Sequence, residues 1–214
     1  MQIRKLQPAT DLQKLEVYLR QQYFANQNMS SWLPERLHDL IYRVSAQEVG
    51  GGRERSMDYI FLWEENEEII ACILPDGENI YTSIKAGFEQ LYPALLSYSE
   101  EHCLPLFGKA DDGSVKFWVA ANDSLTYMQE TLLDMGYARY AEEDYDNYVH
   151  PLETSVSVDL PKGFALLYGA ILRCKEKGIE KCYVNSFGWR KKFYNAAGFL
   201  TEDSIGFWYK TIRC

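Results

Sequence analysis

Long apolar runs and paired cysteines are both missing from this chain of 214 residues. No segment approaches the roughly 20 apolar residues that a membrane-spanning helix needs, and the opening segment MQIRKLQPATDLQ is too polar for a secretory signal peptide. No Cys-x-x-Cys pair occurs among the five cysteines, which are Cys72, Cys103, Cys174, Cys182 and Cys214. An odd number of scattered cysteines favours reduced thiols over a disulfide framework. We therefore expect a cytoplasmic protein whose cysteines serve in packing.

Histidine is also scarce, with only three residues, His38, His102 and His150. They have no metal-ligand spacing to one another or to the cysteines, so we expect no metal site. No Ser-His-Asp or Cys-His arrangement is evident for nucleophilic catalysis either. The sequence gives no reason to predict a metalloenzyme or a triad hydrolase.

The charge is divided unevenly along the chain. The formal net charge is −9, but residues 165–214 hold nine Lys/Arg and four Asp/Glu. Residues 1–164 therefore hold thirteen Lys/Arg against twenty-seven Asp/Glu, a net of −14. A duplex-binding protein needs a broad cationic face, so an acidic body argues against nucleic acid as a partner. A small polyanion suits the basic end better.

Hydrophobic periodicity and turn residues predict alternating strands and helices. We expect strands over 3–6, 58–63, 68–74, 79–84, 116–120 and 144–149, and helices from Pro8, from Pro34 and over 88–102 and 125–135. The segments 58–63 and 68–74 flank Glu64-Glu65-Asn66-Glu67 and should form an antiparallel hairpin. This pattern predicts an α/β (α+β) fold with a mixed, mostly antiparallel sheet flanked by helices.

Residues 165–199 read as a helix, a short strand and a second helix that stops at Gly198-Phe199. Residues 116–137 show a weaker form of the same order, ending at Gly136-Tyr137. We therefore predict two related units, at 1–150 and 165–214, joined by a linker over 151–164.

The element order, and above all the segment Phe193-Tyr194-Asn195-Ala196-Ala197-Gly198-Phe199, resembles the GNAT superfamily of acetyl-CoA-dependent N-acetyltransferases. The resemblance implies a GNAT-like acyl-CoA N-acyltransferase fold of the tandem-domain type. Its N-terminal unit would be degenerate, since Leu132 stands in the place of the tyrosine. The C-terminal unit would be incomplete, because a full unit would have on the order of a hundred more residues between Phe164 and Ala165.

The same resemblance implies acetyl-CoA as co-substrate, a small amine or peptide as acceptor, and direct attack without a covalent intermediate. Tyr194 matches the tyrosine that protonates the departing CoA thiolate, and a phenol with a pKa of about 10 stays protonated at neutral pH. A core tyrosine with its hydroxyl at the surface is the alternative. Asn185, Arg190, Lys191 and Lys192 are the candidate CoA contacts, because cations near a helix N-terminus call for an anionic neighbour. A solvated basic face is the alternative for them.

One family feature is absent. GNAT proteins bind the CoA pyrophosphate with a loop of pattern Q/R-x-x-G-x-G/A at a helix N-terminus, where backbone N–H groups and the helix dipole attract phosphate. The matching segment 81–91 has a single glycine, Gly87, followed by the bulky Phe88 and Glu89, and only Gly163 precedes the helix in the second unit. The second hypothesis is therefore a GNAT-fold binding or regulatory protein without acetyl transfer.

Overall fold

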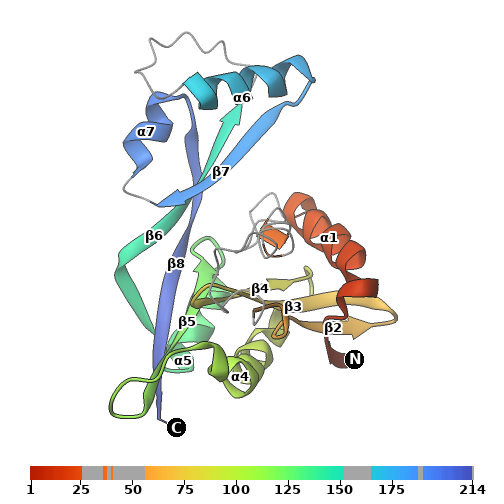
Figure 1. The fold of residues 1–214 in the computed structure, drawn as a ribbon, viewed down its shortest axis with the longest axis vertical. Coiled ribbons are helices and arrows are strands. Elements are labelled where there is room, and N and C mark those ends of the chain that lie inside the picture. Colours follow the sequence, from red (N-terminus) through yellow and green to blue (C-terminus); the bar gives the residue numbers. More distant parts are fainter. Residues whose placement is uncertain (26–35, 38–39, 41–55, 152–164, 188–189, 214) are drawn as a thin grey trace. The chain divides into compact units, whose positions relative to one another are not determined.

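We describe a computed structural model of the chain, which covers residues 1–25, 36–37, 40, 56–151, 165–187 and 190–213 (Figure 1). Contacts group the chain into two units. The first combines Met1–Ala141 with Gly206–Cys214, and the second is Glu142–Ile205. These bounds differ from the predicted ones in assigning the chain's last residues to the first unit. No helix in the described part of the chain is both long enough and apolar enough to cross a membrane.

The first unit is built on five strands that follow one another in the sheet. They are β1 (Gln2–Lys5), β2 (Phe61–Glu65), β3 (Glu68–Asp76), β4 (Asn79–Ile84) and β5 (Ser114–Asn122). The pairs β1–β2, β2–β3 and β3–β4 are antiparallel, whereas β4 and β5 are parallel with Ile80 opposite Val119. The predicted hairpin is confirmed, except that β2 begins at Phe61. A hydrogen-bonded turn from Ser56 to Tyr59 precedes it.

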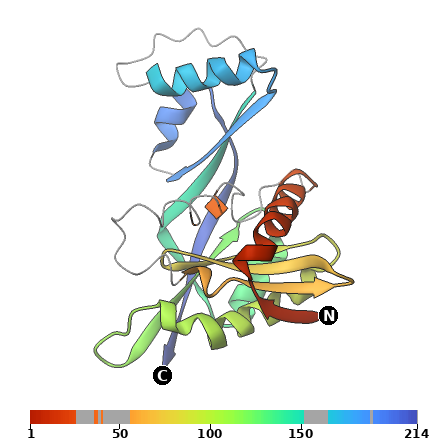
Figure 2. The ribbon, with the colours of Figure 1, turned by 45° about the vertical axis from the view of Figure 1, so that its right-hand side comes forward.

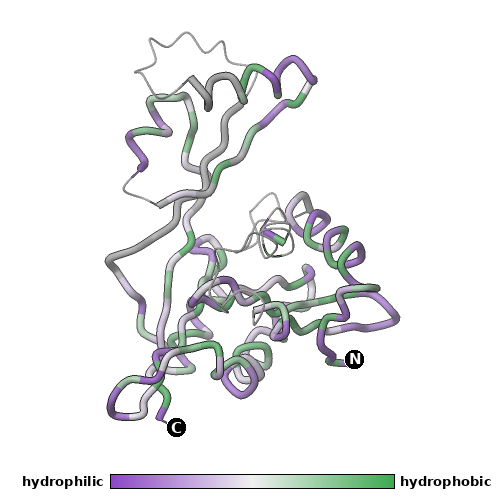
Figure 3. The backbone as a smooth tube through the Cα atoms, in the orientation of Figure 1, coloured by the Kyte–Doolittle hydropathy of each residue, from purple (hydrophilic) through white to green (hydrophobic). Residues whose placement is uncertain are grey.

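Helices cover both faces of this sheet. They are α1 (Pro8–Ala25), α4 (Tyr92–Cys103) and α5 (Thr126–Asp134), with 3₁₀ turns η2 (Glu89–Leu91) and η3 (Leu104–Leu106) flanking α4. β3 is buried continuously from Ile69 to Pro75, as expected for a strand packed on both faces. α1 lies over one face and α4 over the other (Figure 2). Hydrophobic and hydrophilic residues alternate turn by turn along α1 (Figure 3).

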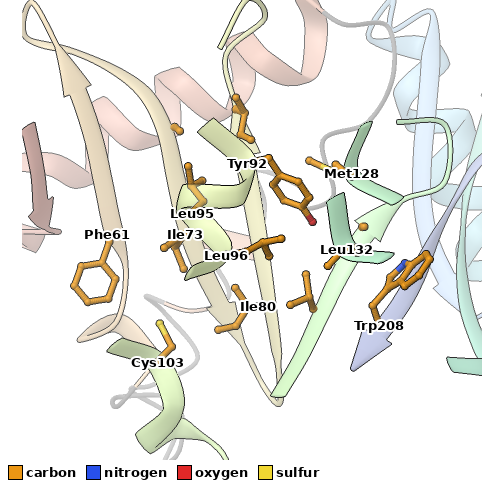
Figure 4. Packing of buried hydrophobic residues seen from close by; sticks show 14 of the residues in the cluster. Phe61, Ile73, Ile80, Tyr92, Leu95, Leu96, Cys103, Met128, Leu132 and Trp208 are labelled. Atoms are coloured by element: carbon orange, nitrogen blue, oxygen red, sulfur yellow. The ribbon is translucent and has the colours of Figure 1, made fainter. Parts of the chain in front are cut away.

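The core of the first unit lies between the sheet and the α4–α5 side. Tyr92, Leu95 and Leu96 of α4 point toward Ile73 and Ile80 of the sheet (Figure 4). Trp208, near the end of the chain, belongs to the same buried cluster. Trp208, with Ile212 packed against the cluster, therefore brings the end of β8 into the core of the first unit.

Two polar clusters fasten the first unit. The phenol of Tyr137 donates to Glu100 Oε1 over 2.8 Å, and Lys210 Nζ lies 2.9 Å from the same oxygen, so the chain's end is tied to α4. Arg4 bonds the carboxylates of Asp11 and Glu64, at 2.5 and 2.7 Å. These hydrogen bonds to a guanidinium hold the pKa of both carboxyl groups below the usual range.

The second unit contains the remaining elements, which are β6 (Ala138–Pro151), α6 (Ala165–Glu176), β7 (Lys181–Phe187), α7 (Lys191–Ala196) and β8 (Leu200–Arg213). β6 and β7 pair antiparallel, from Tyr145 opposite Phe187 to Pro151 opposite Lys181. β6 begins before the first residue of this unit and β8 ends after its last residue, so both strands also contribute to the first unit. The strand order of the whole sheet is β1-β2-β3-β4-β5-β8-β6-β7.

This architecture confirms the predicted fold class. β4 has the predicted bounds, and β6 is much longer than the predicted strand over 144–149. The predicted helix from Pro34 lies largely outside the described residues, as do the linker from residue 152 onward and Phe164, where the second unit is predicted to be incomplete. The tandem arrangement of two related units stays a prediction.

Three helices end in the same way, with a glycine in the left-handed region followed by an apolar residue. At α7, Phe199 N–H donates to the Tyr194 carbonyl over 3.0 Å and Gly198 N–H to the Asn195 carbonyl over 3.1 Å, which is the Schellman pattern. α5 repeats it around Gly136 and α6 around Gly178. Glycine adopts the positive φ of this position, 86° at Gly198, without the steric cost that a side chain adds.

Candidate functional site

The loop between β4 and α4 is where the resemblance places a phosphate-binding loop in the first unit. Its glycine, Gly87, has φ 89°, and its backbone N–H donates to Glu89 Oε1 over 2.9 Å. Phe88 N–H turns back onto the Lys85 carbonyl over 3.0 Å. The N–H group that would face a phosphate thus already has an anionic partner from the chain itself. A phosphate there would have to displace a carboxylate of the same charge sign.

Tyr194 lies in α7 and is half-buried. Its ring contacts Phe199 and Phe193 edge-on, with centroid distances of 5.7 and 5.1 Å. It packs on a small cluster whose buried members are Ile171, Ala197 and Phe199. In a Schellman motif the residue that accepts the long hydrogen bond commonly packs against the residue after the glycine. Tyr194 and Phe199 occupy these two positions, so the ring has a structural role whatever its hydroxyl does.

The predicted CoA contacts all belong to the second unit. Arg190 directly precedes α7 and Lys191 and Lys192 form its first turn, and all three side chains are exposed. Asn185 lies in β7 opposite Asn147, and its side chain is outside the described part of the structure. The structure therefore groups three exposed cations with Tyr194 on one short helix.

A feature that the sequence did not reveal is a cavity of about 210 Å³ in the first unit, between α1, the β2–β3 turn and the end of β4. It is lined by Lys14, Val17, Tyr18, Gln21, Gln22, Glu67, Glu68, Ile69 and Lys85. The sequence Glu64-Glu65-Asn66-Glu67 was enough to predict the β2–β3 hairpin. The cavity was not, because its two walls are about 50 residues apart in the chain.

Among the described residues, no group of three or more His, Cys, Asp or Glu side chains is placed to hold a metal ion. The four cysteines that the structure describes are free thiols. Burial raises the pKa of Cys182 to about 11, and its neighbour Cys174 adds to the effect. Burial also raises the pKa of Cys72 and Cys103, so these two thiols and Cys182 are not activated nucleophiles.

No protein-family model and no curated protein matches this sequence. Among solved structures, the chain is similar to a GCN5-related N-acetyltransferase from Sphaerobacter thermophilus, with a TM-score of 0.59 and 12% identity over 100% of this chain and 96% of that one. A GNAT-family acetyltransferase from Streptococcus pneumoniae matches at TM-score 0.48 and 10% identity, over 99% of both chains. A ribosomal-protein-alanine N-acetyltransferase from Brucella melitensis matches at 0.47 and 9%, over 99% of this chain and 100% of that one. The first of these likenesses shows that this chain has the GNAT acetyltransferase fold.

Proposed function

We propose that this protein transfers an acetyl group from acetyl-CoA to a primary amine of a small-molecule or peptide acceptor. The observation that carries the proposal is the GNAT fold itself, matched over the whole chain by the Sphaerobacter structure. A fold can host several functions, so the proposal also needs residues suited to the chemistry. The chain's own candidates are the cations at 190–192 and the phenol of Tyr194.

The residues at the start of α7 suit a phosphorylated co-substrate better than the β4–α4 loop does. Arg190, Lys191 and Lys192 are exposed cations, able to attract the phosphate groups of CoA. In the β4–α4 loop, by contrast, the Gly87 N–H is bonded to the Glu89 carboxylate. We therefore assign CoA binding to the second unit, with Asn185 as a further contact.

The proposed reaction needs one proton at the leaving group. The acceptor nitrogen attacks the thioester carbon, the C–S bond breaks, and the sulfur receives a proton from the Tyr194 hydroxyl. The tyrosinate then regains a proton from the acceptor ammonium through solvent. In this proposal no bond forms between the acetyl group and the protein.

A second function has its own support. The bond between Gly87 and Glu89 removes a phosphate-binding donor from the first unit, and the packing of Tyr194 on Phe199 explains that residue without catalysis. Both observations favour a GNAT-fold binding or regulatory protein that transfers no acetyl group.

Two measurements on the full chain separate these functions. Calorimetry with CoA and with acetyl-CoA tests binding, and mass spectrometry of a panel of primary amines incubated with acetyl-CoA tests transfer. Binding with acetylated product supports the enzyme. Binding without product, for a panel that includes amino acids, diamines and peptides, supports the binding protein. A folded chain that binds neither CoA nor acetyl-CoA overturns both the enzyme and the CoA site at 190–192.

A further inference from the structure

We propose that Cys174 and Cys182 form a redox-sensitive pair, whose thiols close into a disulfide when a small-molecule disulfide such as oxidised glutathione accumulates. The proposal concerns the second unit alone and does not rest on the proposed function, since neither CoA nor an acceptor takes part. Both residues are free thiols with partly exposed side chains. The structure therefore shows the reduced form of the pair.

The backbone brings the two cysteines together where α6 turns into β7. Cys174 lies in the last turn of α6, and its carbonyl accepts the long hydrogen bond of the glycine cap, from Ile179 N–H over 3.0 Å. Gly178 supplies the positive φ, 72°, at which the helix stops. Only residues 175–181 separate the two cysteines, so Cys182 returns at the start of β7 close to the end of the helix.

The two side chains also meet. The thiol of Cys174 is hydrogen-bonded to that of Cys182. Both side chains pack on the small cluster of Ile171, Ala197 and Phe199. A disulfide needs two Cα atoms about 4.4–6.8 Å apart and side chains directed at each other. Thiols that already share a hydrogen bond are directed in this way, so we expect the bridge to need only small side-chain adjustments.

The bridge forms by two successive thiol–disulfide exchanges. One cysteine thiolate attacks a sulfur atom of oxidised glutathione, which gives a mixed disulfide and releases one glutathione thiol. The thiolate of the other cysteine then attacks the protein sulfur of this mixed disulfide and releases the second glutathione thiol. Two protein thiols are thereby oxidised to one disulfide, and the reagent disulfide is reduced to two thiols, which take up the two protons.

The exchange is slow at neutral pH. Burial and the neighbouring Cys174 raise the pKa of Cys182 to about 11, and only the thiolate attacks. The pair is therefore a device that responds to the equilibrium redox state, and it is not a fast catalytic dithiol. Closing it fastens the end of α6 to the start of β7, beside the cluster on which Tyr194 also packs.

The test equilibrates the full chain, without CoA, in mixtures of reduced and oxidised glutathione. After alkylation, mass spectrometry should show that two of the five cysteines have lost their hydrogen atoms to a disulfide. Trypsin cleaves after Arg173, Lys175, Lys181 and Arg190, so the non-reduced digest should contain peptide 174–175 linked to peptide 182–190. Absence of this linked product, or a bridge to Cys214 in its place, overturns the proposal.

The same equilibration in denaturing urea measures what the fold contributes. The equilibrium constant for bridge formation should be at least tenfold larger in the folded chain, because the fold holds the two sulfur atoms near each other. Equal constants would mean that only the short sequence separation matters, and they would refute the proposed pair. This comparison uses the wild-type chain, so it does not depend on the folding of any variant.

Three variants identify the partners. Cys174→Ser and Cys182→Ser should each abolish the bridge and leave at most a glutathione adduct on the remaining cysteine. Cys214→Ser is the matched control and should form the bridge with an equilibrium constant within twofold of the wild-type value. A bridge that persists in Cys174→Ser or Cys182→Ser contradicts the assignment. Acetyl transfer is measured separately, so its presence or absence leaves this result unaffected.

Discussion

Replacing Tyr194 by phenylalanine removes one oxygen atom and leaves the ring in place. The ring contact with Phe199 at 5.7 Å and the Schellman hydrogen bonds, which involve only backbone atoms, are both kept. The variant therefore isolates the hydroxyl from the packing role of the side chain.

The two roles predict effects of different size. If the hydroxyl protonates the CoA thiolate, its loss should lower kcat by roughly 10²–10⁴, the usual contribution of general acid catalysis. That is about 3–5 kcal/mol in the activation barrier. If the hydroxyl only makes a hydrogen bond at a half-buried position, the cost is about 1 kcal/mol of folding stability, with little effect on turnover. The Kd for CoA should stay within about twofold in both cases, because the acid acts in the transition state.

The assay is the initial rate of acetylated-amine formation, measured by mass spectrometry. A thiol reagent would give a background here, because the chain has free cysteines. Tyr209→Phe is the matched control, since Tyr209 is a half-buried tyrosine in β8 that packs on Trp118. A kcat for Tyr194→Phe within threefold of the wild-type value refutes the catalytic assignment and leaves Tyr194 as a packing residue.

Three further outcomes are expected. Changing Arg190–Lys192 to glutamine should weaken CoA binding by roughly 3–100-fold, at about 0.2–1 kcal/mol per exposed charge, whereas neutralising the three cations in 173–177 should not; equal effects would mean non-specific attraction. Tyr137→Phe should lower the free energy of unfolding by about 1–3 kcal/mol in urea titrations, against less than about 0.5 for Tyr209→Phe, because only Tyr137 loses a part-buried hydrogen bond to a carboxylate. Wild-type stability should fall as the pH drops from about 5 to 3, because the carboxylates that Arg4 bonds have lowered pKa values in the folded state and their contribution is lost on protonation. Arg4→Gln should show a shallower fall, and a parallel one would contradict this linkage.

Local patterns were enough to predict most of the first unit. β3 is polar only at its two ends, Glu68 and Asp76, on either side of a buried apolar run, and the acidic residues around Asn66 mark the hairpin turn, so both could be predicted from neighbouring residues. The order β5-β8-β6 could not be predicted in this way, because β8, the last strand in the chain, lies between two strands that come much earlier in the sequence. The cavity beside α1 escaped prediction for the same reason.

The helix ending in glycine and an aromatic residue, which occurs at 136–137 and 198–199 and suggested two related units, has a local physical origin. At both 132–137 and 194–199, the first residue accepts a hydrogen bond from the backbone N–H of the last, and a glycine precedes that last residue. The last residue is buried in each case, with Tyr137 at 3% and Phe199 at 1% exposure. α6 ends with the same hydrogen bonds around Gly178 although it shows no aromatic residue there. This glycine-capped ending is common wherever a helix stops and the next residue packs into the core. Two segments with the same ending are therefore no evidence of an internal repeat. The shared glycine-aromatic ending therefore supports the helix ends that we predicted more strongly than it supports a tandem repeat, and the enzymatic role that we propose for Tyr194 depends on its hydroxyl alone.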